Sequence, residues 1–389
     1  MCKWFFWFMI KNFQIQNTKL FVNTNNFLKN NFTVKSFPRN YEVKINNKYS
    51  DFKKKINDKD SIIIIDRKIF KIYFSKGIIQ NKKIIKINAQ EKEKDLKTTN
   101  KILNFFVKNN VSKNNKIYAI GGGIIQDLAG YSCSVYKRGL SWIYVPTTFL
   151  GMTDSCVGGK VGINFGKAKN LAALFSAPSK VLININYLDT LSKKDLLSGL
   201  GEALRLHLTG GNYFVKKFQK DIDGALKFNK KNLINIIKHS LLIKKAVVEE
   251  DEYEFDIRRS MNFGHSYGHA LEVLCNHSIP HGKAVTIGMC VETILCSKKF
   301  KIPKKISELI MSLSIKLLNT EDYKNLRKIN LKKLNLVMLK DKKTLNGIIK
   351  LTVPKKIGFI KFYNQKLDKN NINEIIEANK IFMQKFKKK

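Results

Sequence analysis

The stretch Ile117-Tyr-Ala-Ile120 runs directly into Gly121-Gly122-Gly123, and this junction is the best guide to the fold. A short apolar run that leads into glycines and then a helix is typical of a buried strand in a nucleotide-binding sheet. In that setting the helix N-terminus presents backbone N–H groups to a pyrophosphate. The full dinucleotide fingerprint is absent, and glycines also form ordinary tight turns, so the junction by itself leaves both interpretations open.

Further strands are predicted on both sides of this junction. Ser61-Ile-Ile-Ile-Ile-Asp66 is a continuous β-branched run, as expected for a strand that is buried on both faces. The other predicted strands are residues 83–87, 142–145 and 181–185, and a helix is expected from about residue 98. Strands that alternate with helices indicate an α/β fold with a mostly parallel, Rossmann-like sheet.

The second half of the chain has a different pattern. After about residue 188 the strand signals fade, and long amphipathic stretches such as 232–250 and 260–275 follow. We therefore expect an N-terminal α/β domain over residues 39–187 and an all-helical C-terminal domain over residues 188–389.

Residues 1–38 stand apart in composition. They lack acidic side chains and contain a short apolar run, Trp4 to Ile10, after Lys3. A signal peptide would need a longer apolar segment, and an organellar presequence is usually richer in Arg and Ser. We expect a poorly ordered extension, with a targeting segment as the alternative.

No run in the chain approaches the roughly 20 apolar residues that span a bilayer, so no membrane association is expected.

The charge and cysteine patterns bound the function. The chain has 72 basic and 30 acidic residues, a net charge of +42, and its lysines are spread along the whole sequence rather than gathered in patches. A nucleic-acid-binding protein would concentrate them, so nucleic acid is not an expected partner, although it remains the alternative from another functional class. The positive field suits an anionic substrate.

The six cysteines form no CxxC pair, which indicates reduced thiols and a cytoplasmic protein.

Four of the six histidines fall between His265 and His281. His265 and His269 are spaced i and i+4, which places both imidazoles on one face of a helix, and such a pair can ligate zinc. His281 follows Pro280, where a loop could bring it to the same point. Capping or core roles are the other explanation for these histidines.

A carboxylate is the expected third ligand, because a catalytic zinc keeps one position open. Glu202 lies in an otherwise apolar helical stretch that runs to Leu208, so its charge needs a partner. An i,i+3 ion pair with Arg205 is one explanation and zinc ligation is the other.

Several cations lie near glycines, where they can meet a phosphate or a carboxylate. Lys160, in Val157-Gly-Gly-Lys160, is the clearest case, whereas any single lysine in so basic a chain can be a solvated surface residue. The others are Arg138, Lys167, Lys169, Lys244 and Arg258.

From Gly121-Gly-Gly-Ile-Ile-Gln-Asp127-Leu-Ala-Gly130 onward the chain resembles the 3-dehydroquinate synthase family, a branch of the sugar-phosphate cyclases. The resemblance covers about residues 39–365 and rests on motifs that occur in the family's order. These motifs are Tyr136-Lys-Arg138-Gly139, Val145-Pro-Thr-Thr148, Asp154-Ser-Cys-Val-Gly-Gly-Lys160, Lys169-Asn170, Gly201-Glu202, Asp251-Glu252, Arg258, Asn262-Phe-Gly-His265, Gly268-His269-Ala270, His281-Gly282 and Lys340-Asp-Lys-Lys343.

The resemblance implies an NAD-binding N-terminal domain and a C-terminal domain that holds zinc, with cobalt as a second option. It implies Glu202, His265 and His281 as the metal ligands, which leaves His269 near the substrate phosphate and in proton transfer. Positions that match NAD contacts are Asp66, Glu91, Lys94, Gly122, Gly123, Asp127, Thr147, Thr148, Asp154, Lys169 and Thr190. Positions that match substrate contacts or catalytic residues are Lys160, Asn170, Arg205, Lys244, Arg258, Asn262 and one lysine of the pair Lys342 and Lys343.

The resemblance also implies a homodimer, because Arg138 matches a residue that reaches the neighbouring subunit's phosphate site. The implied reaction converts 3-deoxy-arabino-heptulosonate 7-phosphate to 3-dehydroquinate and phosphate, a step of the shikimate pathway. A substrate hydroxyl would be oxidised transiently by NAD, phosphate would leave, the hydride would return and an intramolecular aldol step would close the ring.

Three positions depart from the family pattern. Gln126 stands where Gly is usual, Cys156 where Ser is usual, and Arg205 where Lys is usual. Arg cannot give up its proton and prefers bidentate partners, so a different substrate is conceivable. The alternatives are a paralogous sugar 7-phosphate cyclase, a metal-dependent polyol dehydrogenase and a non-catalytic relative.

Overall fold

The computed structural model describes residues 10–27, 29–45, 49–75, 77–80, 83–166, 168–276, 278–339 and 347–387. The chain forms two compact units. One unit spans Asn25–Leu191, and the other joins the N-terminal residues up to Thr24 to Ser192–Lys389. The predicted boundary near residue 187 therefore falls close to the end of the first unit.

The unit Asn25–Leu191 is built on a seven-stranded sheet with the order β3-β4-β11-β8-β7-β5-β6. Neighbouring strands run parallel except β3 and β4, which are antiparallel. The strands are β3 (Asn31–Val34), β4 (Tyr41–Ile45), β5 (Ser61–Asp66), β6 (Ile84–Ile87), β7 (Lys116–Gly121), β8 (Trp142–Pro146) and β11 (Lys180–Ile183). The mostly parallel sheet predicted from the sequence is confirmed.

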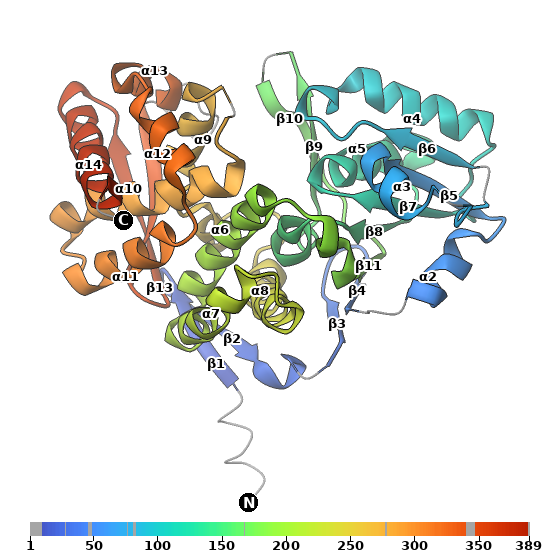
Figure 1. Cartoon of the computed structure of the whole chain (residues 1–389), viewed down its shortest axis with the longest axis horizontal. Helices are drawn as coiled ribbons and strands as arrows, with labels where there is room; N and C mark the ends of the chain where they lie inside the picture. Colours follow the sequence, from blue (N-terminus) through green and yellow to red (C-terminus); the bar gives the residue numbers. More distant parts are fainter. Residues whose placement is uncertain are drawn as a thin grey trace, which may run out of the picture. The chain divides into compact units, whose positions relative to one another are not determined.

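The same unit has helices between these strands (Figure 1). They are α2 (Tyr49–Ile56), α3 (Arg67–Tyr73), α4 (Leu96–Lys108) and α5 (Gly123–Val135), with the short turns η2 (Glu91–Glu93), η3 (Tyr136–Arg138), η4 (Gly151–Ser155) and η5 (Ile185–Thr190). The four isoleucines of β5 are fully buried because helices cover the sheet. Asp66 and Asp95 begin α3 and α4, and each side chain accepts a backbone N–H of its helix. A hairpin of β9 (Lys160–Phe165) and β10 (Ala168–Phe175) completes the unit.

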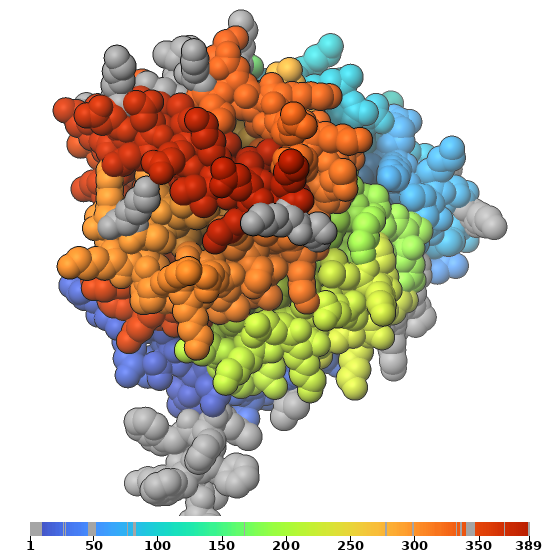
Figure 2. Space-filling view, turned by 60° about the vertical axis from the view of Figure 1, so that its left-hand side comes forward, coloured from blue at the N-terminus to red at the C-terminus, as the bar shows by residue number. Residues whose placement is uncertain are grey.

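The second unit is mostly helical. Its helices are α6 (Lys193–Gly210), α7 (Asn212–Ala225), α8 (Lys230–Glu250), α9 (His265–Leu274), α10 (His281–Phe300), α11 (Lys304–Ile315), α12 (Thr320–Arg327), α13 (Leu334–Leu339) and α14 (Lys369–Lys387), with the turns η6 (Ile257–Asn262) and η7 (Leu331–Lys333). The C-terminal helix α14 packs against α10, and Figure 2 shows its red surface beside the orange one. No helix in the described part of the chain is both long and apolar enough to cross a membrane.

Two predictions need correction here. The C-terminal unit is not all-helical, because it contains a four-stranded sheet with the order β12-β13-β1-β2. Its strands are β1 (Ile10–Ile15), β2 (Thr18–Asn23), β12 (Ile348–Lys356) and β13 (Phe359–Lys366). Residues 10–34 are likewise not a poorly ordered extension, since they carry β1, β2 and β3. Alternate side chains of the first two strands, Phe13, Ile15, Leu20 and Val22, are buried, and β1 pairs in parallel with β13, as the blue and red strands of Figure 1 show.

Candidate active site

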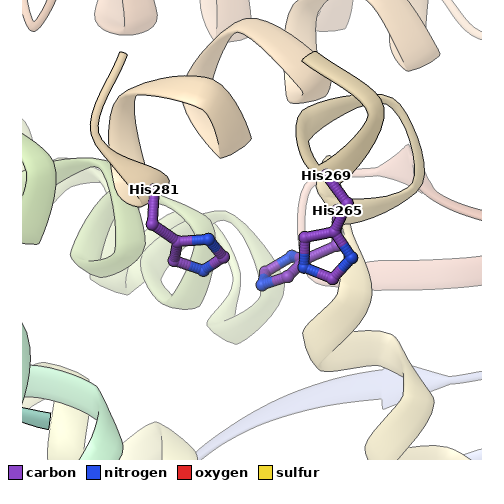
Figure 3. Close-up of side chains that lie close together, drawn as sticks. All are labelled: His265, His269 and His281. Atoms are coloured by element: carbon purple, nitrogen blue, oxygen red, sulfur yellow. The ribbon is translucent and has the colours of Figure 1, made fainter. Parts of the chain in front are cut away.

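Two helix starts bring three imidazoles together in the C-terminal unit. His265 is the first residue of α9 and His281 is the first residue of α10, and α9 packs against α10. His269 follows one turn along α9. The ring of His265 lies 5.3 Å from each of the other two ring centroids, and one ligand atom from each ring lies within 4.8 Å of the others. Figure 3 shows the three rings converging from the two helices.

Glu202 on α6 completes this cluster. Its side chain is 1% exposed, and its Oε1 lies 3.6 Å from His265 Nε2 and 3.1 Å from His281 Nε2. Its Oε2 accepts a hydrogen bond of 2.7 Å from Arg205 Nε. Burial alone would raise the pKa of Glu202, but the charges of Arg205, then His265 and His281, outweigh burial and hold that pKa well below its usual range. The carboxylate is therefore ionised.

The surroundings of Glu202 Oε1 show whether a divalent cation fits this site. This oxygen is buried, and although His281 Nε2 lies 3.1 Å away, no hydrogen bond of good geometry reaches it from the described residues. A charged oxygen in such a place is costly unless a cationic group pairs with it. A divalent cation between this oxygen and the two Nε2 atoms would satisfy it. One carboxylate and two imidazoles are a donor set that zinc accepts, with a further position left for substrate.

The other ring nitrogens support this arrangement. His281 Nδ1 lies 2.9 Å from Glu272 Oε2, and His265 Nδ1 lies 3.3 Å from the carbonyl oxygen of Phe263. Burial alone would lower the pKa of His281, but its hydrogen bonds to Glu202 and Glu272 outweigh burial and raise that pKa to about 10, so without a cation Nε2 is protonated. A cation would take the place of that proton, while each Nδ1 could still donate to its acceptor. The residues present therefore fit a divalent cation. Our sequence analysis missed Glu272, although it is a lone acid in an apolar helical stretch, the same signal that identified Glu202.

Arg205 occupies the position where the sequence departs from the family pattern. It is 2% exposed, and its Nη1 lies 3.3 Å from Met261 Sδ while its Nε binds Glu202. The predicted i,i+3 ion pair is present together with the convergence of Glu202 on the imidazoles, so the two explanations for Glu202 coexist.

The remaining predicted residues of this unit lie on segments that pack against α6. Turn η6 contacts both α6, which carries Glu202, and α8, which carries the buried Lys244. Arg258 on η6 is 2% exposed, and its guanidinium donates to the Glu252 carbonyl. Asn262 Nδ2 donates to Glu254 Oε1 at 3.2 Å. Lys342 lies outside the described residues.

In the unit Asn25–Leu191, predicted cofactor residues gather at the carboxyl ends of β5, β7 and β8. The chain leaves β5 toward β6 on one side and β7 toward β8 on the other, so the strand order reverses between β5 and β7. Open α/β sheets bind ligands at such a reversal. Asp66 ends β5, Gly122 and Gly123 follow β7, and Thr147 and Thr148 follow β8.

The space around the glycines at this edge of the sheet shows whether a dinucleotide fits there. A Cβ at Gly122 would lie 2.9 Å from Thr148 Cγ2, so only glycine allows this close approach. Outside the neighbouring residues and the helix's own backbone, no atom of the described chain comes within 4 Å of a Cβ built on Gly123, the first residue of α5. No side chain caps this helix start at Gly122, so its N–H groups suit a pyrophosphate and the residues fit NAD.

Three further predicted residues surround the buried Lys94. Its Nζ lies 3.0 Å from Asp127 Oδ2, 2.5 Å from Asn170 Oδ1 and 3.5 Å from Glu91 Oε1. Burial raises the pKa of Asp127 to about 6, and the neighbouring Lys94 offsets only part of that effect. Gln126, one of the three departures from the family pattern, is buried nearby: its Nε2 donates to the Ser155 carbonyl at 2.8 Å, and its Oε1 accepts from the Ser155 hydroxyl at 2.6 Å.

Other predicted residues are placed outside these clusters. Thr190 Oγ1 lies 2.8 Å from the Tyr73 hydroxyl. Lys160 starts β9, Lys169 lies on β10, and both are exposed. Asp154 is on η4, and Arg138 is exposed on η3 with a φ of 61°.

Comparisons with known proteins agree with this arrangement. Residues 84–198 match the family model described as 3-dehydroquinate synthase N-terminal, and residues 199–344 match the one described as 3-dehydroquinate synthase C-terminal. The chain is 33% identical over 323 residues to a 3-dehydroquinate synthase of Dictyoglomus turgidum, across 82% of this chain and 89% of the relative.

Two solved structures have the same fold. One is 2-deoxy-scyllo-inosose synthase complexed with carbaglucose-6-phosphate, NAD+ and Co2+, with a TM-score of 0.78, 22% identity and coverage of 89% of this chain and 99% of that one. The other is 2-epi-5-epi-valiolone synthase from Streptomyces hygroscopicus with NAD+ and Zn2+ bound, with a TM-score of 0.76, 20% identity and coverage of 91% and 100%.

Proposed function

The chain belongs to the 3-dehydroquinate synthase family, and on this premise we propose that it converts 3-deoxy-arabino-heptulosonate 7-phosphate to 3-dehydroquinate and phosphate. The observation that carries the proposal is the buried Glu202 Oε1, which faces the Nε2 atoms of His265 and His281. Such a site suits an enzyme that must acidify an alcohol before hydride transfer.

Two bound groups are part of this proposal. NAD would accept and then return a hydride, and a divalent cation, zinc or alternatively cobalt, would acidify the substrate hydroxyl. Glu202, His265 and His281 would hold the cation. NAD would be held by the uncapped N-terminus of α5 and by the residues that the sequence assigns to it, namely Asp66, Glu91, Lys94, Gly122, Gly123, Asp127, Thr147, Thr148, Asp154, Lys169 and Thr190.

The remaining polar residues would handle the phosphate and the protons. Arg258 is buried and permanently charged, so it suits the phosphate oxygens, and we assign Lys160 and Asn170 to the same group. His269 lies beside the metal ligands without being needed as one, and it would exchange a proton during phosphate departure. Lys244, Asn262, Arg205 and Lys342 would orient the ring hydroxyls and the carboxylate.

Three wider properties complete the proposal. We assign the reaction to the carbon–oxygen lyases, since phosphate leaves by elimination. We assign the exposed Arg138 to a partner site in a homodimer. The described cysteines are all free, as befits a cytoplasmic protein.

The test is phosphate release by the purified protein with NAD and Zn2+. We expect release from 3-deoxy-arabino-heptulosonate 7-phosphate and loss of release in Glu202→Gln. Release from sedoheptulose 7-phosphate alone would overturn the substrate and favour a paralogous cyclase. Release from neither substrate, with recovery in Arg205→Lys, would show that Arg205 sets a different specificity.

A further inference from the structure

Glu292 is a buried carboxylate in the middle of α10 that neither the proposed chemistry nor the sequence patterns use. It is 1% exposed. Its Oε2 accepts the backbone N–H of Gly264, and its Oε1 accepts the backbone N–H of Tyr267, both at 3.0 Å. These two groups flank the start of α9, where the backbone N–H groups have no partner within the helix.

Glu292 therefore replaces a cap that α9 lacks. Helices usually begin with a residue whose side chain accepts an N–H of the first turn, but α9 begins after Gly264, which has no side chain and a φ of 79°. The capping carboxylate comes from the neighbouring helix instead. His265, one of the proposed ligands, lies between the two N–H groups that Glu292 binds.

Glycines make this reach across the helices feasible. A Cβ at Gly288 would lie 2.0 Å from the Gly264 carbonyl oxygen, and a Cβ at Gly268 would lie 3.1 Å from the Ala284 backbone. The backbones of α9 and α10 thus touch, and the short Glu292 side chain spans the contact. On its other side the first turn of α9 is held by Tyr267, whose hydroxyl donates to Asn379 Oδ1 at 2.6 Å.

The two helices hold each other in a reciprocal way. Glu272 on α9 contacts the ring of His281, the first residue of α10. Glu292 on α10 fixes the first turn of α9, from which His265 projects. A carboxylate on the other helix therefore contacts His281 or the first turn that carries His265, the two proposed imidazole ligands.

We propose that Glu292 is a positioning residue for the metal centre, which sets the place of His265 Nε2 by fixing the first turn of α9. This inference rests on the proposed ligation by Glu202, His265 and His281. A purely structural cap would change stability only, whereas a positioning residue changes the geometry and affinity of the bound cation. Partners that orient metal ligands typically contribute 10–100-fold in affinity.

The test measures binding of Co2+ and Zn2+ alone, without NAD or substrate. Glu292→Gln keeps the shape of the side chain but sets an NH2 group against a backbone N–H. We expect its Co2+ and Zn2+ affinities to fall about 10–100-fold and the visible spectrum of bound Co2+ to shift. Asp221→Asn is the matched control, because Asp221 is a buried carboxylate of the same unit that accepts from Asn232 and Asn235. It should lower the melting temperature of the metal-free protein and leave both Co2+ readouts unchanged.

A folded Glu292→Gln protein with wild-type affinity and an unchanged Co2+ spectrum would overturn the inference. If that variant does not fold, Glu292→Asp decides, since it keeps the charge but shortens the reach. Weaker Co2+ binding by Glu292→Asp supports the inference, and wild-type binding overturns it. Phosphate release by the wild-type enzyme is measured separately, so failure of the proposed reaction would not be confused with failure of this inference.

Discussion

At the scale of single residues, Glu202 has two partners that use different oxygens. Arg205 binds Oε2, while Oε1 faces His265 and His281. The buried Arg205 charge favours the ionised carboxylate, and it also restrains the carboxylate so that a single oxygen is presented to a cation. An Arg in place of Lys at this position is therefore compatible with a metal site.

At this scale we predict which side chains bind the cation: Glu202, His265 and His281 rather than His269. We expect Glu202→Gln and His281→Asn to lose Zn2+ affinity by more than about 100-fold, beyond the range typical of outer partners. His269→Asn should keep its affinity within a few-fold and lose phosphate release, because its ring is placed beside the ligands. Competition with a chromogenic chelator measures all three affinities. If His269→Asn lost as much affinity as His281→Asn, the cation would instead be held by the three imidazoles.

At the scale of elements, one buried lysine joins three segments of the Asn25–Leu191 unit. Lys94 follows η2, Asp127 lies on α5 and Asn170 lies on β10. Burial of Asp127 is only partly compensated by Lys94, so its pKa rises to about 6 from an ordinary value of 3.8. The protonation state of Asp127, and with it the stability of this unit, should therefore change near pH 6.

The expected response follows from the sign of that shift. A carboxyl whose pKa is raised on folding stabilises the fold fully below about pH 4, and this contribution is lost as the pH rises through about 6. Asp127→Asn cannot ionise, so between pH 4 and pH 7 the difference in unfolding free energy between this variant and wild type should change by about 2 kcal/mol in favour of the variant. Trp142 is buried in β8, and with Trp4 and Trp7 replaced by Phe its fluorescence reports on this unit alone. A difference that stays constant across this pH range would contradict the shift.

Elements also explain which parts of the structure could be predicted from the sequence. Four consecutive isoleucines predict strand β5, and the glycines after β7 predict a helix start. Both could be predicted because each signal lies within one short stretch of sequence. Strands β1 and β2 also carry a local signal, the alternation of Phe13, Ile15, Leu20 and Val22, which the composition of residues 1–38 led us to overlook. The pairing of β1 with β13 gives no local signal, because β13 lies at the other end of the chain. The roles of Glu272 and Glu292 depend on how α9 crosses α10, which no spacing within one helix reveals.

At the scale of the whole molecule, the N-terminal strands belong to the unit that carries Glu202 and the three clustered histidines. Backbone bonds connect them to α6, the helix of Glu202. The N–H of Gln14 in β1 donates to the Gly358 carbonyl at 2.8 Å, and the N–H of Gly358 donates to the Leu208 carbonyl at 3.2 Å. Strand β1 also packs against α6, and β2 packs against α8. The start of the chain therefore supports the helices of the candidate site.

The last prediction follows from this placement. Ile15 in β1 is fully buried, so Ile15→Ala should cost about 2–5 kcal/mol of unfolding free energy in the C-terminal unit. The matched control is Phe21→Ala in β2, because Phe21 is 58% exposed and its removal should cost within about 0.5 kcal/mol. Hydrogen–deuterium exchange locates the effect: in Ile15→Ala we expect faster exchange in α6 and unchanged exchange in β7 of the other unit. Unchanged exchange in α6 would show that the N-terminal strands do not support the helix of Glu202.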